Sequence, residues 1–472
     1  MSDVAGGAVS FLILLALLAL RVPIGVAMLA VGCGGFAWIQ GWGPLFSFLK
    51  TAPFDTFATY SFSVIPLFLL MGNVASTSGL SARLFRGANT LLGHYRGGMA
   101  MAAVGACAAF GTICGSSLAT AATMGQVALP EMRKYGYSGA LATGTLAAGG
   151  TLGILVPPSI PLVVYAILTE QNIAKLFLAA FIPAGIAVIG FFLAIRAYLL
   201  FDPEAAPAPF KLPTITRLQQ VLATWPVLAI FVIVFVGMNG DFFVGRSLFT
   251  PTEGAAIGAM LATIAAVTVG GLTWRSVMQS LAATAGQSGM IFLILLGAEL
   301  YNAFLARTHM PQLAALWVAG LGISPYLVMA VIVVIYILLG CLMDSLSMIL
   351  LTVPIFFPMI MGLPFGLTPE HTAIWFGIIA LIVVELGLIH PPVGLNVYVI
   401  QSIAGDVSLL QTFKGVVPFL IAEFFRVSLI IAFPAVTLVR PDGYVAWASD
   451  DPDPAAREAA AERAVRLWCG PR

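Results

Sequence analysis

The chain has 472 residues, of which 60% are hydrophobic and only 9% are charged, and its mean hydropathy is +1.03. A soluble chain of this length would need far more charge to cover its surface, so a soluble globular domain is excluded. The net charge of +1 gives no bulk attraction to nucleic acid, and no such partner is expected. Apolar segments of about 18 residues or more recur from end to end, which predicts an all-α polytopic protein embedded in the lipid bilayer.

The first apolar run, residues 8–38, is too long for the hydrophobic region of a signal peptide and is predicted to be a retained helix that contains Arg21. The five cysteines form no C-x-x-C pair, and we expect small buried side chains. A polar, proline-rich segment at 201–217 divides the chain, and from Arg440 a charged extension follows, to which no function is assigned. The further predicted membrane segments are 55–75, 97–130, 139–169, 173–200, 221–237, 252–270, 280–303, 323–361, 371–401 and 414–438.

Two of these segments are predicted to be re-entrant hairpins. Segment 97–130 is 34 residues long and carries no charge, and Arg96 and Arg133 stand just outside its two ends. Because cytoplasmic loops are rich in Lys and Arg, both ends are expected on the cytoplasmic side, with the tip at "CGSS" (114–117). Segment 323–361 folds about "CLMDSLS" (341–347), and its flanks are poor in Lys and Arg, which indicates entry from outside.

The two halves of the sequence can be aligned on a pair of proline motifs. "LGILVPPSIPLV" (152–163) and "LGLIHPPVGLNV" (386–397) share Leu, Gly, the Pro pair and the final Val at a constant offset of 234 residues. The crossing at 221–237 would invert the second half relative to the first, as in many secondary transporters. The predicted domains are a first inverted repeat (1–200, with hairpin 97–130 and broken helix 139–169), a linker with a connecting helix (201–250), a second repeat (251–439, with hairpin 323–361 and broken helix 371–401) and a polar tail (440–472).

A helix broken in the hydrocarbon core exposes backbone groups that need a ligand. Pro157 and Pro158 have no N–H, so the turn before them is rich in oxygen. The carbonyls of residues 153–156 can point at a cation, with the hydroxyls of Ser116 and Ser117 opposite on the first hairpin tip. Oxygen ligands without a carboxylate cage suit Na⁺, and the helix ends at each gap attract ions and anionic groups.

In this order, "GSS" (115–117), "LPEMRKYGY" (129–137) and "GILVPPSIP" (153–161) closely resemble the large membrane subunit of the tripartite ATP-independent periplasmic (TRAP) transporters, DctM type. The resemblance leaves out only the tail. It implies a sodium-coupled, elevator-type importer of a small organic anion, such as a C4-dicarboxylate or a sugar acid, in the bacterial cytoplasmic (inner) membrane. It also implies two partners, a small membrane subunit of four helices and a periplasmic binding protein, and no cofactor besides Na⁺ as the coupling ion.

The resemblance implies one sodium site at each pairing of a hairpin tip with a broken helix, and a substrate between the two tips. The first sodium site falls on Ser116, Ser117, Gly153, Val156 and Pro158; the second falls on Gly340, Asp344, Ser345, Gly387, His390 and Val393; and the substrate path falls on Ser116, Asp344, Ser345 and Asn396.

This sequence departs from the family's usual pattern at two positions. Cys114 stands where a Ser is common, and His390 stands where a Thr is common. A neutral imidazole is a poor Na⁺ ligand and a protonated one repels Na⁺, so His390 puts the second sodium site in doubt. Three interpretations stay open: a proton replaces one sodium ion there, the ring contacts the substrate, or the ring turns away and only the backbone carbonyl is a ligand.

Charged residues at membrane depth are functional candidates, because each costs at least about 2.5–3.5 kcal/mol at a helix centre. We expect Asp344, at the second tip, to lie near the transport path. Glu385 is interpreted equally well as a functional group or as a hydrogen-bonded structural carboxylate. Glu253, Glu299 and Glu423 are nearer the ends of their segments and are expected to be solvated or paired. Neither tip contains an Arg, so anion recognition would depend on helix N-termini and hydroxyls.

The sequence bears on two other functions. A stand-alone sodium-dicarboxylate symporter or an ion antiporter of similar architecture would show much the same repeat, and stays open as the alternative. No motif supports a membrane-embedded enzyme: H-E-x-x-H, G-x-S-x-G and His or Cys pairs at metal-ligand spacing are all absent from the sequence.

Overall fold

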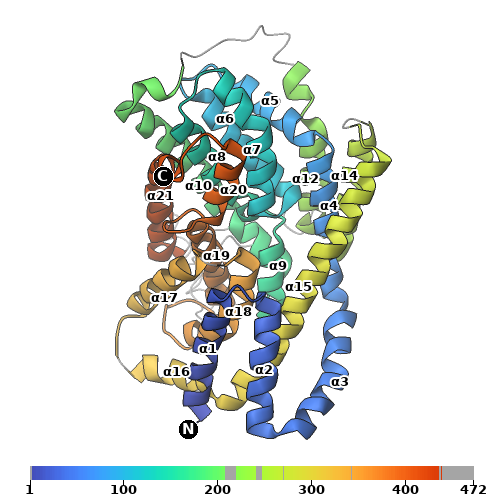
Figure 1. Cartoon of the computed structure of the whole chain (residues 1–472), viewed down its shortest axis with the longest axis vertical. Coiled ribbons are helices and arrows are strands. Elements are labelled where there is room, and N and C mark those ends of the chain that lie inside the picture. The colour runs from blue at the N-terminus through green and yellow to red at the C-terminus, as the bar shows by residue number, and fades with distance from the viewer. Residues whose placement is uncertain are drawn as a thin grey trace, which may run out of the picture.

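The computed structural model describes residues 3–207, 219–240, 247–268, 271–320, 322–341, 343–434 and 437, and throughout these ranges the regular elements are helices (Figure 1). Residues 208–218 and 241–246 of the predicted linker and all of the predicted tail lie outside the described residues. In chain order the elements are α1 (Asp3–Ala19), α2 (Ile24–Gln40), α3 (Trp42–Ala58), η1 (Tyr60–Ser63), α4 (Val64–Thr77), α5 (Leu80–Leu92), α6 (Gly98–Cys114), α7 (Ser117–Lys134), α8 (Gly139–Leu155), α9 (Ile160–Leu168), α10 (Ile173–Phe201), η2 (Pro203–Ala205), α12 (Trp225–Met238), α14 (Pro251–Thr268), α15 (Trp274–Thr308), α16 (Met310–Gly320), α17 (Pro325–Gly340), α18 (Ser345–Met361), α19 (Pro369–Gly387), α20 (Leu395–Ala404) and α21 (Leu409–Ala432).

The segments expected to be hairpins each hold two helices with a short turn between them. α6 and α7 lie in the upper half of the molecule in Figure 1, whereas α17 and α18 lie in the lower half. The first proline motif separates α8 from α9, and the two helices bend by 43° at the break. The second proline motif separates α19 from α20. Each motif therefore interrupts a helix at the place where the prolines remove backbone donors.

The N-terminal apolar run forms two helices, so the prediction of one helix over residues 8–38 is wrong. Arg21 follows α1 in a left-handed conformation (φ 64°), and its N–H donates to the Leu18 carbonyl at 2.8 Å. The N–H of Val22 reaches back to Leu17 at 3.0 Å, which completes a Schellman cap with Arg where Gly is usual. The charged side chain thus lies at a turn between two helices instead of inside one.

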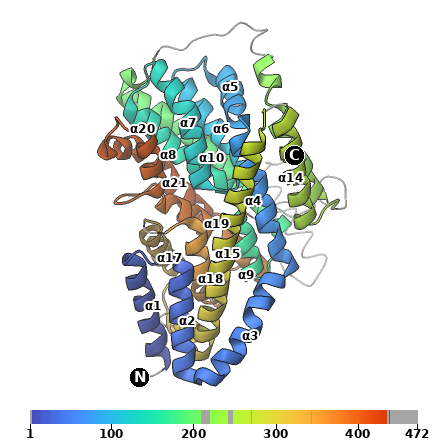
Figure 2. The same ribbon diagram turned by 45° about the vertical axis from the view of Figure 1, so that its right-hand side comes forward.

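A second group of helices, α2, α4, α14 and α15, is held together by close contacts, with α15 running along much of the molecule's length (Figure 2). A Cβ atom at Gly32 would lie 2.8 Å from the backbone nitrogen of Tyr301, and one at Gly297 would lie 2.7 Å from the Gly25 carbonyl oxygen. Small residues let membrane helices approach closely in this way. Asn73 of α4 adds hydrogen bonds of 3.0 Å to two side chains of α15.

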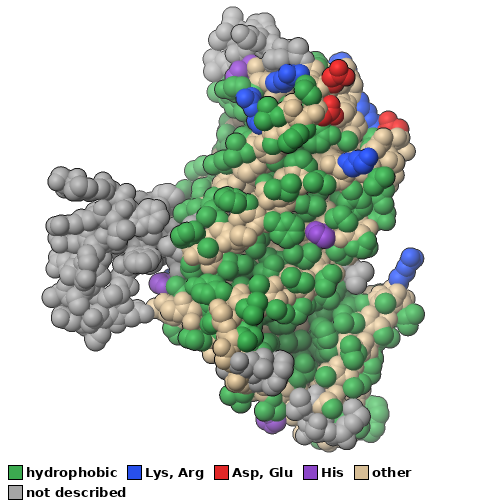
Figure 3. Space-filling model, turned by 90° about the vertical axis from the view of Figure 1, so that its left-hand side faces the viewer, with side chains coloured by type: hydrophobic (Ala, Val, Ile, Leu, Met, Phe, Trp, Pro, Cys, Tyr) green, Lys and Arg blue, Asp and Glu red, His purple; other side chains and the backbone are tan. Residues whose placement is uncertain are grey.

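The described surface is that of a multi-pass membrane protein. Within the described ranges, six helices are long and apolar enough to cross a bilayer, or seven when the bent pair α8 and α9 is counted as one span. Hydrophobic side chains cover the middle of the face in Figure 3, and most of its acidic and basic side chains gather toward the upper end. A band of apolar surface between polar ends is what the hydrocarbon core of a membrane requires.

Candidate functional site

The first hairpin tip lies against the break between α8 and α9. Gly115 turns the chain in a left-handed conformation (φ 62°), and Ser116 caps α7 by accepting the Ala119 N–H at 3.4 Å. Gly111 packs directly on Gly153, since a Cβ atom at Gly111 would lie 2.7 Å from the Gly153 Cα atom. A Cβ atom at Gly153 would in turn lie 2.8 Å from the Ser116 carbonyl oxygen. The fold therefore brings these two sequence-predicted residues together.

The first break leaves backbone oxygens without their usual helical donors. In a continuous helix the carbonyls of Gly153 and Ile154 would be bonded by the residues four positions later, which are Pro157 and Pro158 and have no N–H. The peptide bond between these prolines is cis. Val156, also assigned to this site from the sequence, is half-buried and forms the C-cap of α8. An oxygen-rich turn thus faces the hairpin tip.

Two hydroxyls at this break were missed by the sequence analysis. Thr120 Oγ1 and Ser159 Oγ are buried and form no hydrogen bond with the described residues, although the Cys114 thiol lies near Thr120. A Cβ atom at Gly153 would lie 2.3 Å from Thr120 Oγ1. The signal that could have found Thr120 is its spacing of four residues from Ser116, which puts both on one face of α7. Ser159 could have been found as the first residue after the prolines.

This set of oxygens suits a hard cation, since carbonyl and hydroxyl oxygens are the ligands that such ions prefer. Across the described ranges, no group of three or more His, Cys, Asp or Glu side chains could hold a metal ion. Cys114 lies beside the tip, with its Sγ 3.9 Å from the Ser116 carbonyl oxygen. A cation at this tip would therefore be held by neutral oxygens rather than by a cluster of charged ligands.

The second hairpin tip lies against the second break in the same manner. A Cβ atom at Gly387 would lie 2.6 Å from the Gly340 Cα atom, so these two backbones touch. Asp344, half-buried, caps α18 by accepting the Ser347 N–H at 3.2 Å and the hydroxyl of the same residue. Gly394 (φ 64°) precedes α20. The second tip therefore repeats three features of the first: a close contact between glycines, a polar N-cap and a helix broken at a Pro pair.

The second break differs from the first because its oxygens have partners within the chain. The His390 N–H donates to the Gly387 carbonyl at 3.3 Å, and the Asn396 N–H donates to the Leu388 carbonyl at 3.0 Å. The Cys341 thiol, whose shortest contact is the Ile337 carbonyl of its own helix at 3.3 Å, also faces the carbonyls of His390 and of the proline after it, at 3.7 and 3.6 Å. A cation at this break would have to compete with these internal contacts.

The His390 ring lies against its own loop and α21. Its Nδ1 atom is 2.5 Å from the Pro391 carbonyl oxygen, and the ring packs edge-on against Phe424 with the centroids 6.3 Å apart. Among the described hydrogen bonds and ring contacts, none joins the ring to the second tip. Val393, assigned to the same site, is half-buried in this loop. This geometry fits the interpretation in which His390 offers its backbone rather than its ring.

The two tips approach each other around Glu385 of α19. Ser345, the first residue of α18, donates its hydroxyl to Glu385 Oε1 at 2.6 Å. Ser117, the first residue of α7, lies close to the same carboxylate. Asn396, assigned to the substrate path, is fully buried, and its amide donates to the Ala147 carbonyl of α8 at 3.4 Å. Asn396 therefore joins α20 to α8, while its Oδ1 atom has no hydrogen-bond partner among the described residues, and its place on the substrate path stays a prediction.

A buried ion pair lies beside this carboxylate. Glu423 and Arg426 of α21 are bonded to each other with side-chain exposures of 2% and 3%, and Arg426 also donates to the Pro183 carbonyl at 3.3 Å. Glu423, expected to be solvated or paired near a helix end, is paired, but in the middle of its helix. Arg426 was not singled out, although its spacing of three residues from Glu423 is typical of a helical ion pair.

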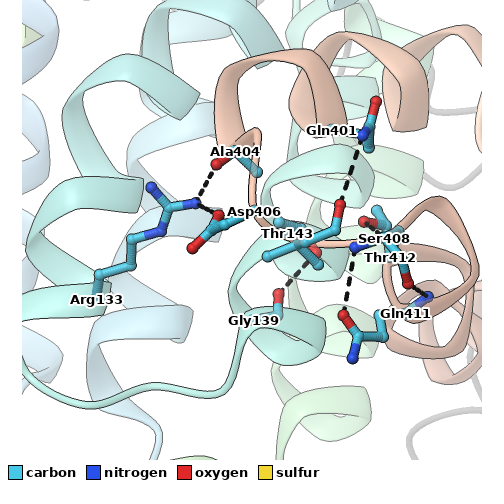
Figure 4. Close-up of polar contacts among 10 residues, drawn as sticks. Arg133, Gly139, Thr143, Gln401, Ala404, Asp406, Ser408, Gln411 and Thr412 are labelled. Atoms are coloured by element: carbon cyan, nitrogen blue, oxygen red, sulfur yellow. Dashed lines mark hydrogen bonds and ion pairs between the residues drawn. The ribbon is translucent and has the colours of Figure 1, made fainter.

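Two further ion pairs connect the halves of the chain. Figure 4 shows Arg133, at the end of α7, bonded to the Ala404 carbonyl at 2.5 Å and paired with Asp406 after α20. Lys175 of α10 pairs with Glu370 in the first turn of α19 at 2.5 Å. In both pairs the cation comes from the first half and the carboxylate from the second, so the halves hold one another.

The fold belongs to the class of all-helical polytopic membrane proteins. The crystal structure of the Alcanivorax borkumensis YdaH transporter is similar, with a TM-score of 0.56 over 82% of this chain and 88% of that one. The two sequences are 15% identical, so this likeness concerns the fold alone.

Sequence comparison defines the family. The model of the DctM component of tripartite ATP-independent periplasmic transporters matches residues 11–436. The C4-dicarboxylate TRAP transporter large permease protein DctM of Pseudomonas aeruginosa is 35% identical over 82% of this chain and 88% of its own length. The sialic acid TRAP transporter large permease protein SiaM of Vibrio cholerae is 28% identical over 92% and 98%, and the isethionate TRAP transporter permease protein DctMQ of Oleidesulfovibrio alaskensis is 29% identical over 89% and 64%. The chain belongs to the DctM family of large TRAP permease subunits, and it is a transport protein rather than an enzyme.

Membership in this family implies a small membrane subunit and a periplasmic binding protein as partners, and a place in the inner membrane. A second family model, the C-terminal part of aromatic-ring hydroxylases, matches residues 425–471, most of which lie outside the described residues.

Proposed function

We propose that this subunit carries the transport path of a sodium-coupled importer that moves a small organic anion across the bacterial cytoplasmic membrane. The observation that carries the proposal is the pairing of two hairpin tips with two proline-broken helices, which meet at Glu385. The named relatives are a C4-dicarboxylate, a sialic acid and an isethionate permease, and these compounds are all small organic anions. A periplasmic binding protein would deliver the anion, and a small four-helix membrane subunit would complete the complex.

The first sodium ion would be held at the first break. The carbonyls there lack helical donors, and two buried hydroxyls beside them form no hydrogen bond with the described residues. A bound sodium ion would stabilise these oxygens in place of the missing donors. Ser117 lies beside Glu385, and we assign it to the contact between the tips. The proposed ligands are oxygens of Ser116, Thr120, Gly153, Val156, Pro158 and Ser159.

A second sodium ion would be held at the second break, after the Cys341 thiol releases the carbonyls that it faces. The proposed ligands are backbone oxygens of Gly340, Gly387, His390 and Val393. The substrate anion would lie between the tips, near Asp344, Ser345 and Ser116. Its negative charge would be stabilised by the N-termini of α7 and α18, because the first N–H groups of a helix have no partner within it.

The order of elements supports inverted repeats and an elevator-type motion. α6–α10 and α17–α21 both run hairpin, broken helix, last helix, and the hairpins occupy opposite halves of the molecule in Figure 1. The group α2, α4, α14 and α15 makes a separate set of close contacts. We assign this group to a static frame, past which the unit that carries both tips would slide.

The test is uptake into liposomes that hold this chain and its small membrane partner. Radiolabelled succinate, N-acetylneuraminate and isethionate are each offered with and without an inward Na⁺ gradient, and with and without a loaded binding protein. We expect uptake of one of them to need both. Gly153→Val, which fills the first site, serves as the inactive control.

Each other outcome contradicts a part of the proposal. Uptake with Na⁺ alone would indicate the stand-alone symporter. Uptake driven by a pH gradient in the absence of Na⁺ would overturn sodium coupling. Failure of all three anions under every condition would overturn the substrate class.

A further inference from the structure

Glu385 contacts both hairpin tips from a third element. Its Oε1 atom accepts the Ser345 hydroxyl of the second tip at 2.6 Å, and Ser117 of the first tip lies close to the same carboxylate. The two serines hold equivalent places, each being the first residue of its helix. Each follows directly on a polar N-cap, Asp344 for α18 and Ser116 for α7. A movement of either tip can therefore displace the other tip through the Glu385 side chain.

This carboxylate is costly for a structural residue. Glu385 is 1% exposed, and its Oε2 atom has no hydrogen-bond partner in the described part of the chain. The nearby Arg426 is already paired with Glu423, so an ionised Glu385 would have no counterion of its own in the described part of the chain. A buried charge without a counterion is strongly destabilising. Because apolar residues would fill this position at lower cost, its location where the tips meet indicates a role in their action.

We propose that Glu385 is a positioning residue that couples the two tips, so that a sodium ion bound at one break orders the other. The inference rests on the proposed sodium coupling. The first break has free oxygens and can take an ion directly, whereas the second must first give up internal contacts. An ion at the first break fixes the start of α7, and with it Ser117, Glu385 and Ser345. Because these residues are then already ordered, a sodium ion binds at the second break with a smaller loss of conformational entropy. This effect is positive cooperativity.

The test is binding of radioactive sodium to the full chain in complex with its small membrane partner. The Hill coefficient of the unchanged protein should approach about 2, its limit for two coupled sites. Glu385→Ala should lower it toward about 1, the value for independent sites, with the amount of sodium bound at saturation unchanged. Glu385→Gln keeps an oxygen that accepts the Ser345 hydroxyl and should retain most of the cooperativity.

Thr352→Val is the matched control. Thr352 lies in α18, the helix that Ser345 begins, and its buried hydroxyl donates to the Tyr336 hydroxyl at 2.8 Å rather than to a tip residue. The substitution should leave the Hill coefficient unchanged. If Glu385→Ala does not fold, Ser117→Ala carries the test, because it removes the contact of one tip only. It should lower the Hill coefficient in the same direction.

Two results would overturn the proposal. An unchanged Hill coefficient in Glu385→Ala, or in Ser117→Ala, would show that the tips are not coupled here. A loss in Glu385→Gln as large as in Glu385→Ala would show that charge, rather than hydrogen bonding, matters. Absence of sodium binding to the unchanged protein would instead contradict the proposed function, so the two failures are distinguishable.

Discussion

Thr120 and Thr145 are buried threonines whose hydroxyls lack partners among the described residues, but only Thr120 lies at a break. If Thr120 binds sodium, Thr120→Val should raise the sodium concentration for half-maximal uptake about tenfold, a loss of about 1.4 kcal/mol. The unfolding temperature without sodium should be unchanged or higher, because an unsatisfied hydroxyl is replaced by a methyl group of similar size. The measurements are sodium titration of uptake and thermal unfolding of the purified protein.

Thr145→Val is the control, since it makes the same chemical change in the middle of α8. It should leave the sodium dependence unaltered. An equal shift in both variants would remove Thr120 from the sodium site.

The Glu423–Arg426 pair allows a separate prediction about stability. Arg426→Leu should lower the free energy of unfolding by about 3–5 kcal/mol, because it leaves a buried carboxylate without its partner. The double variant Glu423→Leu/Arg426→Leu should recover most of that loss, since a buried pair replaced by apolar residues is often neutral. Thermal unfolding of all four combinations measures the coupling. A double variant that is no more stable than Arg426→Leu would contradict this account.

At the residue level, the sequence could predict those site residues that belong to a motif. Gly153 and Gly387 stand four residues before a Pro pair, which marks them without a structure. For Thr120 and Arg426 the sequence offers only a helical spacing to a neighbouring polar residue. That spacing does not reveal the break beside Thr120 or the burial of Arg426, because those contacts come from elements far away in the chain. The orientation of the His390 ring was equally inaccessible, since it depends on packing against Phe424.

At the scale of elements, each hairpin is seated on its broken helix by a glycine pair. Gly111→Ala or Gly387→Ala would put a Cβ atom 2.7 or 2.6 Å from backbone of the facing element, which cannot yield as a flexible side chain can. We therefore expect each substitution to separate the tip from the break and to lower uptake at least about tenfold, a cost of about 1.4 kcal/mol or more at the transport step. Uptake into liposomes at equal protein content is the measurement.

Gly185→Ala in α10 is the control, because a Cβ atom there meets only open space in the described structure. It should be neutral or raise the free energy of unfolding by up to about 1 kcal/mol. If Gly111→Ala were as active as this control, the close seating would not matter for transport.

The elements that the sequence specified best are those with strong local punctuation. The Pro pairs and the small-residue tips place turns within long apolar runs, and the structure has turns at these places. The run over residues 8–38 holds one such mark, Pro23 directly before α2, but hydropathy does not detect it because the apolar character continues on both sides of Arg21. The cap there is formed by backbone geometry, and a left-handed Arg is too uncommon to be expected from sequence.

At the scale of the molecule, the halves are interlocked. α20 packs on α7 and α8, while α9 packs on α18 and α19, so the second piece of each broken helix lies in the other half. The ion pairs Arg133–Asp406 and Lys175–Glu370 join the same halves. A unit built in this way would move as one body. It would move relative to helices that make fewer contacts with it. α4 meets α6 at such a boundary.

That boundary provides a test of the sliding motion. Ser76 of α4 lies close enough to Cys114 of the first hairpin to interact with its thiol, and a Cβ atom at Gly72 would lie 2.7 Å from the Cys114 carbonyl oxygen. Ser76→Cys should therefore form a mercury-bridged pair with the native thiol. If the hairpin must slide past α4, mercuric ion should abolish uptake and dithiothreitol should restore it. Ser76→Cys/Cys114→Ala, which retains the other cysteines, should keep its uptake under the same treatment. Cross-linked protein that still transports would show that α4 and the first hairpin travel together, and the division between static frame and moving unit would have to be drawn elsewhere.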